Sequence, residues 1–159
     1  MNTVPHAKRI PYILNHCRTI AMVGLSPKPH RASFDVANYL QSGGYRIIPV
    51  NPNVAMAQGQ VLGEKAYATL LEAAQHEKID LVNCFRNSDD ILPIVDEAIA
   101  IGAKAFWMPL GVTNAAAAAK AEAAGLLVVQ DHCIKIDHRV LLSSGLVQRP
   151  DPQAPATIP

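Results

Sequence analysis

The sequence predicts one α/β domain, in which a five-stranded parallel sheet lies between two layers of helices. The first observation is a series of short runs, apolar on both faces and bounded by turn residues, which is typical of buried parallel strands. The second is that amphipathic segments alternate with these runs, which favours βαβ crossovers. The third is the length of 159 residues, which suits a single sizeable core.

Five apolar runs are the predicted strands, and we expect the order 3-2-1-4-5 when they are counted along the chain. That order places a switch point between strands 1 and 4, with a ligand site at the carboxyl ends of the strands. Helices are predicted between the strands from apolar spacing and from end signals such as an N-cap at Ser33. The strands are 20–23, 47–50, 81–85, 105–108 and 126–129, and the helices are 5–17, 34–41, 69–76, 89–101 and 114–124.

Composition narrows the class of protein. Residues 1–148 are predicted to form the domain, and residues 149–159 a disordered, proline-rich tail. A net charge of +1, no basic block and 5% aromatic residues argue against nucleic acid as a partner. No apolar run approaches the roughly 18 residues that a spanning helix needs, so no membrane partner is expected. The widely spaced Cys17, Cys84 and Cys133 favour reduced thiols in a cytoplasmic protein over a disulfide or zinc site.

The loop from Gly24 to Ser33 is the first candidate site. A glycine between a strand and a helix lets backbone N–H groups and the positive end of the helix dipole face an anion. Lys28 and Arg31 add positive charge, so the loop is predicted to bind phosphate. Ser26 and Pro29 stand where a dinucleotide-binding loop has its second and third glycines. The alternative is a solvated connection that the prolines stiffen.

The loop after the second strand also argues against a dinucleotide. NAD-binding domains usually place an acid there to accept from the ribose hydroxyls. This chain has Asn51-Pro52-Asn53 instead, and the first acid after this strand is Glu64. These residue types favour a turn, which is expected whether or not the turn also touches a ligand.

Two later loops contain further candidates. Arg86 follows the third strand, where it could bind a phosphate bidentately or form an ion pair with Asp89 or Asp90, and both interpretations stay open. Gly111 follows the fourth strand, where it allows a ligand to approach closely or simply permits an unusual backbone angle.

The run Asp131-His132-Cys133 follows the fifth strand and suggests catalysis at first sight. Adjacent residues rarely converge on one reacting atom, and working triads normally come from separated segments. We therefore expect Cys133 to be a packed thiol and name no catalytic or metal-binding residue.

Taken together, these segments resemble the small stand-alone CoA-binding proteins of bacteria, over roughly residues 8–140. Their fold is similar to the three-layer, Rossmann-like CoA-binding domain of the succinyl-CoA synthetase α subunit. One departure is Asp131-His132-Cys133, where the family often has Asp-Arg-Cys, so a charge is lost or becomes pH-dependent. The segments that carry the likeness are 23–26 with Arg31 and Ser33, 44–53, 62–64, 85–86, 97–104, 110–112 and 133–134.

The resemblance implies that CoA binds across the carboxyl ends of the strands. The loop residues Gly24, Leu25, Ser26, Lys28, Arg31 and Ser33 would then hold phosphates of the 3′-phospho-ADP part. By the same analogy, Asn51-Pro52 and Phe85-Arg86 line the nucleotide and pantetheine path, with Leu110-Gly111 near it.

Three functions remain open at this point. The first, which the sequence favours, is binding of CoA or an acyl-CoA without catalysis. The second is an enzyme, either an NADP-dependent reductase or an acyl-CoA enzyme that uses Cys133. The third is a regulatory protein whose nucleotide pocket is unused. A homodimer or an unknown protein partner is compatible with each of them.

Overall fold

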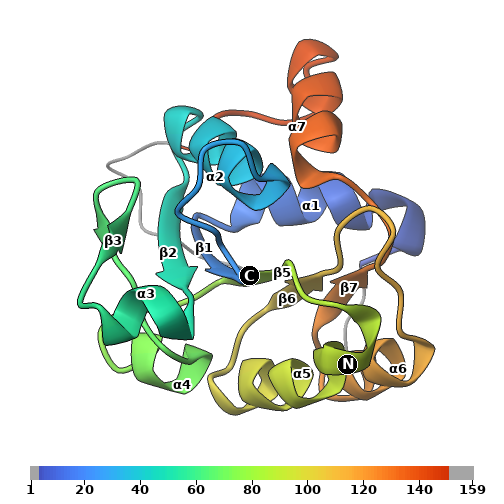
Figure 1. Ribbon diagram of the computed structural model, residues 1–159. Helices are drawn as coiled ribbons and strands as arrows, with labels where there is room; N and C mark the ends of the chain where they lie inside the picture. Colours follow the sequence, from blue (N-terminus) through green and yellow to red (C-terminus); the bar gives the residue numbers. More distant parts are fainter. Residues whose placement is uncertain (1–3, 151–159) are drawn as a thin grey trace.

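A five-stranded parallel sheet forms the middle layer of the protein (Figure 1). The computed structural model describes residues 4–150. Every neighbouring pair of strands in this sheet is parallel, which confirms the predicted three-layer, Rossmann-like α/β fold. From one edge to the other, the strands are β2 (Arg46–Val50), β1 (Thr19–Val23), β5 (Leu81–Cys84), β6 (Ala105–Trp107) and β7 (Leu127–Val129).

Helices cover both faces of the sheet. In Figure 1, α1, α2 and α7 lie on one side of the strands, and α4, α5 and α6 lie on the other. Two short 3-10 turns, η1 (His6–Lys8) and η2 (Ser88–Asp90), lead into α1 and α5. The helices are α1 (Arg9–His16), α2 (Ala32–Ser42), α3 (Pro52–Met56), α4 (Leu70–Ala73), α5 (Ile91–Ala100), α6 (Ala115–Ala123) and α7 (Ile134–Ser143).

The predicted strand order was wrong. Counted along the chain, the five strands of the main sheet lie in the order 2-1-3-4-5, so the switch point is between β1 and β5. The outer edge of β2, where the prediction placed the third strand, is taken by Tyr67. Its N–H donates to Pro49 O at 3.0 Å, and its carbonyl accepts from Asn51 N at 2.9 Å. The single bridge between Tyr67 and Val50 occupies this part of the β2 edge, and the next strand, β5, instead pairs with β1 on the side away from β2.

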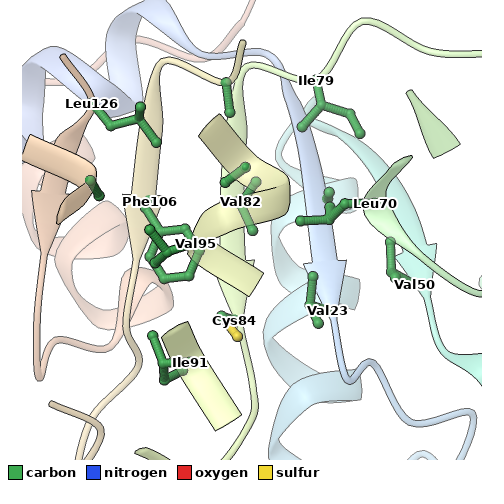
Figure 2. Packing of buried hydrophobic residues seen from close by; sticks show 14 of the residues in the cluster. Val23, Val50, Leu70, Ile79, Val82, Cys84, Ile91, Val95, Phe106 and Leu126 are labelled. Atoms are coloured by element: carbon green, nitrogen blue, oxygen red, sulfur yellow. The ribbon is translucent and has the colours of Figure 1, made fainter. Parts of the chain in front are cut away.

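Two hydrophobic clusters hold the layers together, one on each face of the sheet. Figure 2 shows the first, in which Val95 and Ile91 of α5 pack against Phe106 and Val82 of the sheet. The second cluster includes Trp107 and Leu40, and both are completely buried. The alternation of strand side chains between the two clusters confirms that these strands are buried on both faces.

The helix ends follow the sequence in part. The Asn114 side chain caps α6 by accepting from Ala117 N at 3.0 Å, and Thr69 caps α4 in the same way. Three elements were not predicted: α3, α7 and the small hairpin of β3 (Gln60–Val61) and β4 (Glu64–Lys65). The predicted tail lies outside the described residues except for its first two positions, 149 and 150.

Candidate functional site

The loop after β1 begins at a glycine that the structure requires. Gly24 has φ +81°, and a Cβ added to it would lie 2.3 Å from the carbonyl oxygen of Phe85. Its N–H donates to Val50 O at 2.9 Å. Gly24 thus lets the turns after β1, β2 and β5 meet at one point, because only a residue without a side chain fits there.

Hydroxyl groups fix the shape of this loop. The N–H of Ser26 donates to the Ser33 hydroxyl at 3.0 Å, and the N–H of Lys28 donates to the Ser26 hydroxyl at 3.1 Å. The predicted N-cap was wrong, because Ser33 lies in the first turn of α2 and its hydroxyl bonds the loop. Arg31 takes the N-cap position and gives α2 no side-chain cap.

The N-terminus of α2 therefore keeps free backbone donors. The first α-helical hydrogen bond runs from Asp35 N to Arg31 O, so the N–H groups of Ala32, Ser33 and Phe34 have no acceptor within residues 4–150. Such N–H groups, with the helix dipole, favour an anion. A pocket of about 320 Å³ lies beside this turn, and we call it the loop pocket. It is lined by Gly24, Ser26, Lys28, Arg31, Ala32, Ser33 and Phe85.

Charge at the loop pocket is positive. Lys28 and Arg31 are exposed, and neither forms an ion pair within the described part of the chain. The nearest acid in the sequence, Asp35, is matched by Lys135 of α7, whose Nζ lies 2.7 Å from Asp35 Oδ2. Lys135 was not predicted as part of this region, because only the fold brings it beside α2.

The Asn51 side chain holds two loops together. Its Nδ2 donates to Leu25 O at 2.9 Å, and its Oδ1 accepts from Asn53 N and Val54 N as the N-cap of α3. Pro52 occupies the first position of that helix, as prolines often do. The predicted turn was wrong, because Asn51 is the N-cap of α3 and Pro52 and Asn53 are its first residues, and the amide of Asn51 is used within the protein.

A second pocket lies on the other side of Gly24, and we call it the Arg86 pocket. It has a volume of about 160 Å³. Arg86 is exposed and forms no ion pair with Asp89 or Asp90, so the ion pair that was the alternative to phosphate binding is not formed. The Arg86 pocket is lined by Val23, Val50, Pro52, Ala68, Thr69, Leu70, Arg86, Ile94 and Glu97.

Leu110 and Gly111 are not brought to either pocket. Leu110 is 66% exposed, and Gly111 donates its N–H to Asp131 Oδ1. That bond joins the loops after β6 and β7. His132 is anchored in the same place, since its carbonyl accepts from the buried Trp107 indole at 2.8 Å. Gly111 therefore has a structural role in the arrangement of these loops.

Cys84 ends β5, and Cys133 is the N-cap of α7. Burial raises the pKa of the Cys84 thiol to about 12, so this thiol at the end of β5 stays protonated at neutral pH. Cys133 is half-buried at the start of α7, and its thiol has no histidine partner within residues 4–150. His132 instead pairs with Asp137.

Residues 4–150 hold no cluster of three or more His, Cys, Asp or Glu side chains that could bind a metal ion. None of their helices is long and apolar enough to cross a membrane.

Comparison with known proteins identifies the family of this chain. A family model described as a CoA binding domain matches residues 18–139. The chain belongs to the CoA binding domain family. The match contains the loop pocket and the carboxyl ends of all five strands of the main sheet. The shape and charge of both pockets are therefore considered with CoA as the ligand.

Similar chains from other organisms span nearly the same length. The protein YneT of Bacillus subtilis is 38% identical over 136 residues, which cover 86% of this chain and 96% of YneT. A solved structure of a hypothetical protein from Pyrococcus horikoshii has a TM-score of 0.79 and 36% identity, and the match covers 88% of this chain and 94% of that one. A solved structure of a protein from Thermus thermophilus has a TM-score of 0.78 and 29% identity, and the match covers 87% of this chain and 99% of that one.

Proposed function

We propose that this protein binds CoA or an acyl-CoA through the loop pocket and has no catalytic machinery of its own. The observation that carries the proposal is the uncapped N-terminus of α2, which presents free N–H groups beside Lys28 and Arg31. Three phosphate groups distinguish CoA from an uncharged ligand, and backbone N–H groups with unpaired cations are the donors that phosphates bind.

The two pockets suit different parts of the ligand. The loop pocket is polar and positive, which supports contact with the phosphates of the 3′-phospho-ADP part. The Arg86 pocket has apolar walls from Val23, Val50 and Leu70, which supports contact with a less polar part of the same molecule. Arg86 lies between them, because its Cδ is 3.2 Å from the position that a Cβ at Gly24 would take.

Dinucleotides fit this site less well. No acid follows β2, where Asn51 is occupied with Leu25 O and the cap of α3. Gly24 supplies the tight turn, but Ser26 replaces the second glycine and its hydroxyl and N–H are both committed to the loop. These features favour CoA over NAD or NADP.

The test is a calorimetric titration with CoA, dephospho-CoA, NAD and NADP. We expect CoA to bind, and removal of its 3′-phosphate to weaken binding. Arg31→Ala and Arg86→Ala should each cost at least about 1 kcal/mol, or about fivefold in Kd, as expected for a lost charge-assisted hydrogen bond. Arg139→Ala is the matched control, because this exposed arginine of α7 also forms no ion pair with another of residues 4–150 and lines neither pocket.

Four results would contradict the proposal. Binding of NADP without binding of CoA would favour the reductase, and no binding of any nucleotide would favour a regulatory protein with an unused pocket. Equal affinities of Arg31→Ala, Arg86→Ala and Arg139→Ala would show that the phosphates bind elsewhere. Turnover of an acyl-CoA that disappears in Cys133→Ser would show an enzyme.

A further inference from the structure

A third pocket, which we call the β7 pocket, lies at the outer edge of the sheet, away from the loop pocket at the end of β1. Its volume of about 300 Å³ is at the lower end of the range of small-molecule sites. It shares no lining residue with the loop pocket or the Arg86 pocket. The β7 pocket is lined by His6, Ala7, Arg9, Ile10, Glu122, Val128, Val129, Gln130 and His132.

Arg9 places a largely buried positive charge in this pocket. Its side chain is 13% exposed, and Nη1 donates to Val128 O at 3.0 Å on the free edge of β7. The nearest carboxylate oxygen belongs to Glu122, lies 3.8 Å from Nη1 and is on a half-exposed side chain. Arg9 Nε is buried without an acceptor in the described residues. A guanidinium has five N–H donors, so this one is only partly satisfied.

His132 presents a fixed imidazole to the same pocket. Its Nδ1 lies 2.9 Å from Asp137 Oδ2, and because a carboxylate only accepts, Nδ1 donates and Nε2 is left for a ligand. The backbone of His132 is held on both sides, by the Trp107 indole and by Met108 O. Gln130 is oriented in a similar way, since its Oε1 accepts from Asn114 N at 2.9 Å, and its NH₂ group has no acceptor among the described residues.

We propose that the β7 pocket binds a small carboxylate with an apolar body, through Arg9, Gln130 and His132. Arg9 and Gln130 supply hydrogen-bond donors around one cation, a doubly protonated His132 ring adds an Nε2–H donor, and Ala7, Ile10 and Val128 supply an apolar wall. Glu122 at the same pocket disfavours a dianion such as phosphate, which makes a monoanion the better match. The β7 pocket shares no residue with the proposed CoA site, so this proposal does not depend on CoA binding.

The experiment is an NMR titration of the ¹⁵N-labelled full chain with sodium butyrate and, separately, with sodium phosphate. Butyrate should produce saturable shifts in residues 6–10 and 128–132 and in the His132 imidazole, without shifts in 24–33. Arg9→Gln and His132→Asn should each weaken butyrate binding about fivefold or more. Lys104→Gln, which removes the same charge at the amino end of β6, should leave it unchanged.

Folding of the variants is checked by thermal unfolding, because Arg9→Gln also removes the hydrogen bond to Val128 O. His132→Asn keeps that bond, so the proposal can be tested even if Arg9→Gln is unstable. Absence of saturable shifts, or equal weakening by Lys104→Gln, would overturn the proposal. Tighter binding of phosphate than of butyrate in this pocket would overturn the ligand class.

Discussion

Replacement of Gly24 by alanine should be the most costly small change at the candidate site. Alanine at φ +81° costs about 1–2 kcal/mol on backbone grounds alone. The new Cβ would also lie 2.3 Å from Phe85 O, which forces the backbone to move, and such overpacking costs about 1–3 kcal/mol. The two effects together predict a loss of about 2–5 kcal/mol in the free energy of unfolding.

The matched control is Gly102→Ala. Gly102 follows α5 with φ +74°, but a Cβ there meets no atom within 4 Å, so only the backbone cost of about 1–2 kcal/mol applies. Urea unfolding followed by circular dichroism measures both variants. Since the collision moves the turn that carries Phe85 and Arg86, Gly24→Ala should also weaken CoA binding, whereas Gly102→Ala should not. Equal loss of stability in the two variants would refute this reasoning.

Two other predictions concern side chains that the structure assigns to the protein itself. Asn51→Asp keeps the acceptor that caps α3 but loses the hydrogen bond to Leu25 O, whereas Asn51→Ala loses both. In urea unfolding, Asn51→Ala should therefore be less stable than Asn51→Asp by about 1 kcal/mol. The reverse order would contradict the assigned cap. Burial, and then the charge of Arg149, lower the pKa of His138, so the stability that its neutral form provides is lost as pH falls below about 6.5. His138→Gln should therefore flatten the dependence of unfolding free energy on pH between about 7.5 and 5.5, and an unchanged slope would show that other groups cause it.

Local pattern predicted the strands and most helices of this fold. The run around Phe106 is apolar at every position, and such a run is buried on both faces wherever it lies in the sheet. Asn114 and Thr69 cap their helices by accepting from N–H groups three residues ahead, so their role can be predicted from the local sequence alone.

Strand order could not be predicted because it depends on contacts between distant segments. The place of β5 beside β1 is fixed in part by Asp80, whose Oδ2 accepts from Arg18 N and Thr19 N, about 60 positions away in the chain. The place of the third strand was closed by Tyr67, in a segment with no strand pattern. The helix α7 was missed because it begins at Ile134 after Cys133, which gives it no side-chain cap, so the sequence carries no start signal there.

At the candidate site, the sequence identified the loop but not the use of each side chain. Ser33 was expected to cap α2, yet its hydroxyl accepts from Ser26 N, which leaves the helix end open. Gly111 was expected near the ligand, yet its N–H is bonded to Asp131. In each case a polar group had two possible partners, and tertiary packing selected between them.

Both outer strands of the main sheet are guarded at their free edges. Tyr67 bonds the backbone beside Pro49 on β2, and the Arg9 guanidinium takes Val128 O on β7. Strands from a second copy would have to displace these groups before a continuous intermolecular sheet could form. Self-association, where it occurs, should therefore use helix surfaces, and α7 offers Ile136 and Val140, which are 46% and 58% exposed.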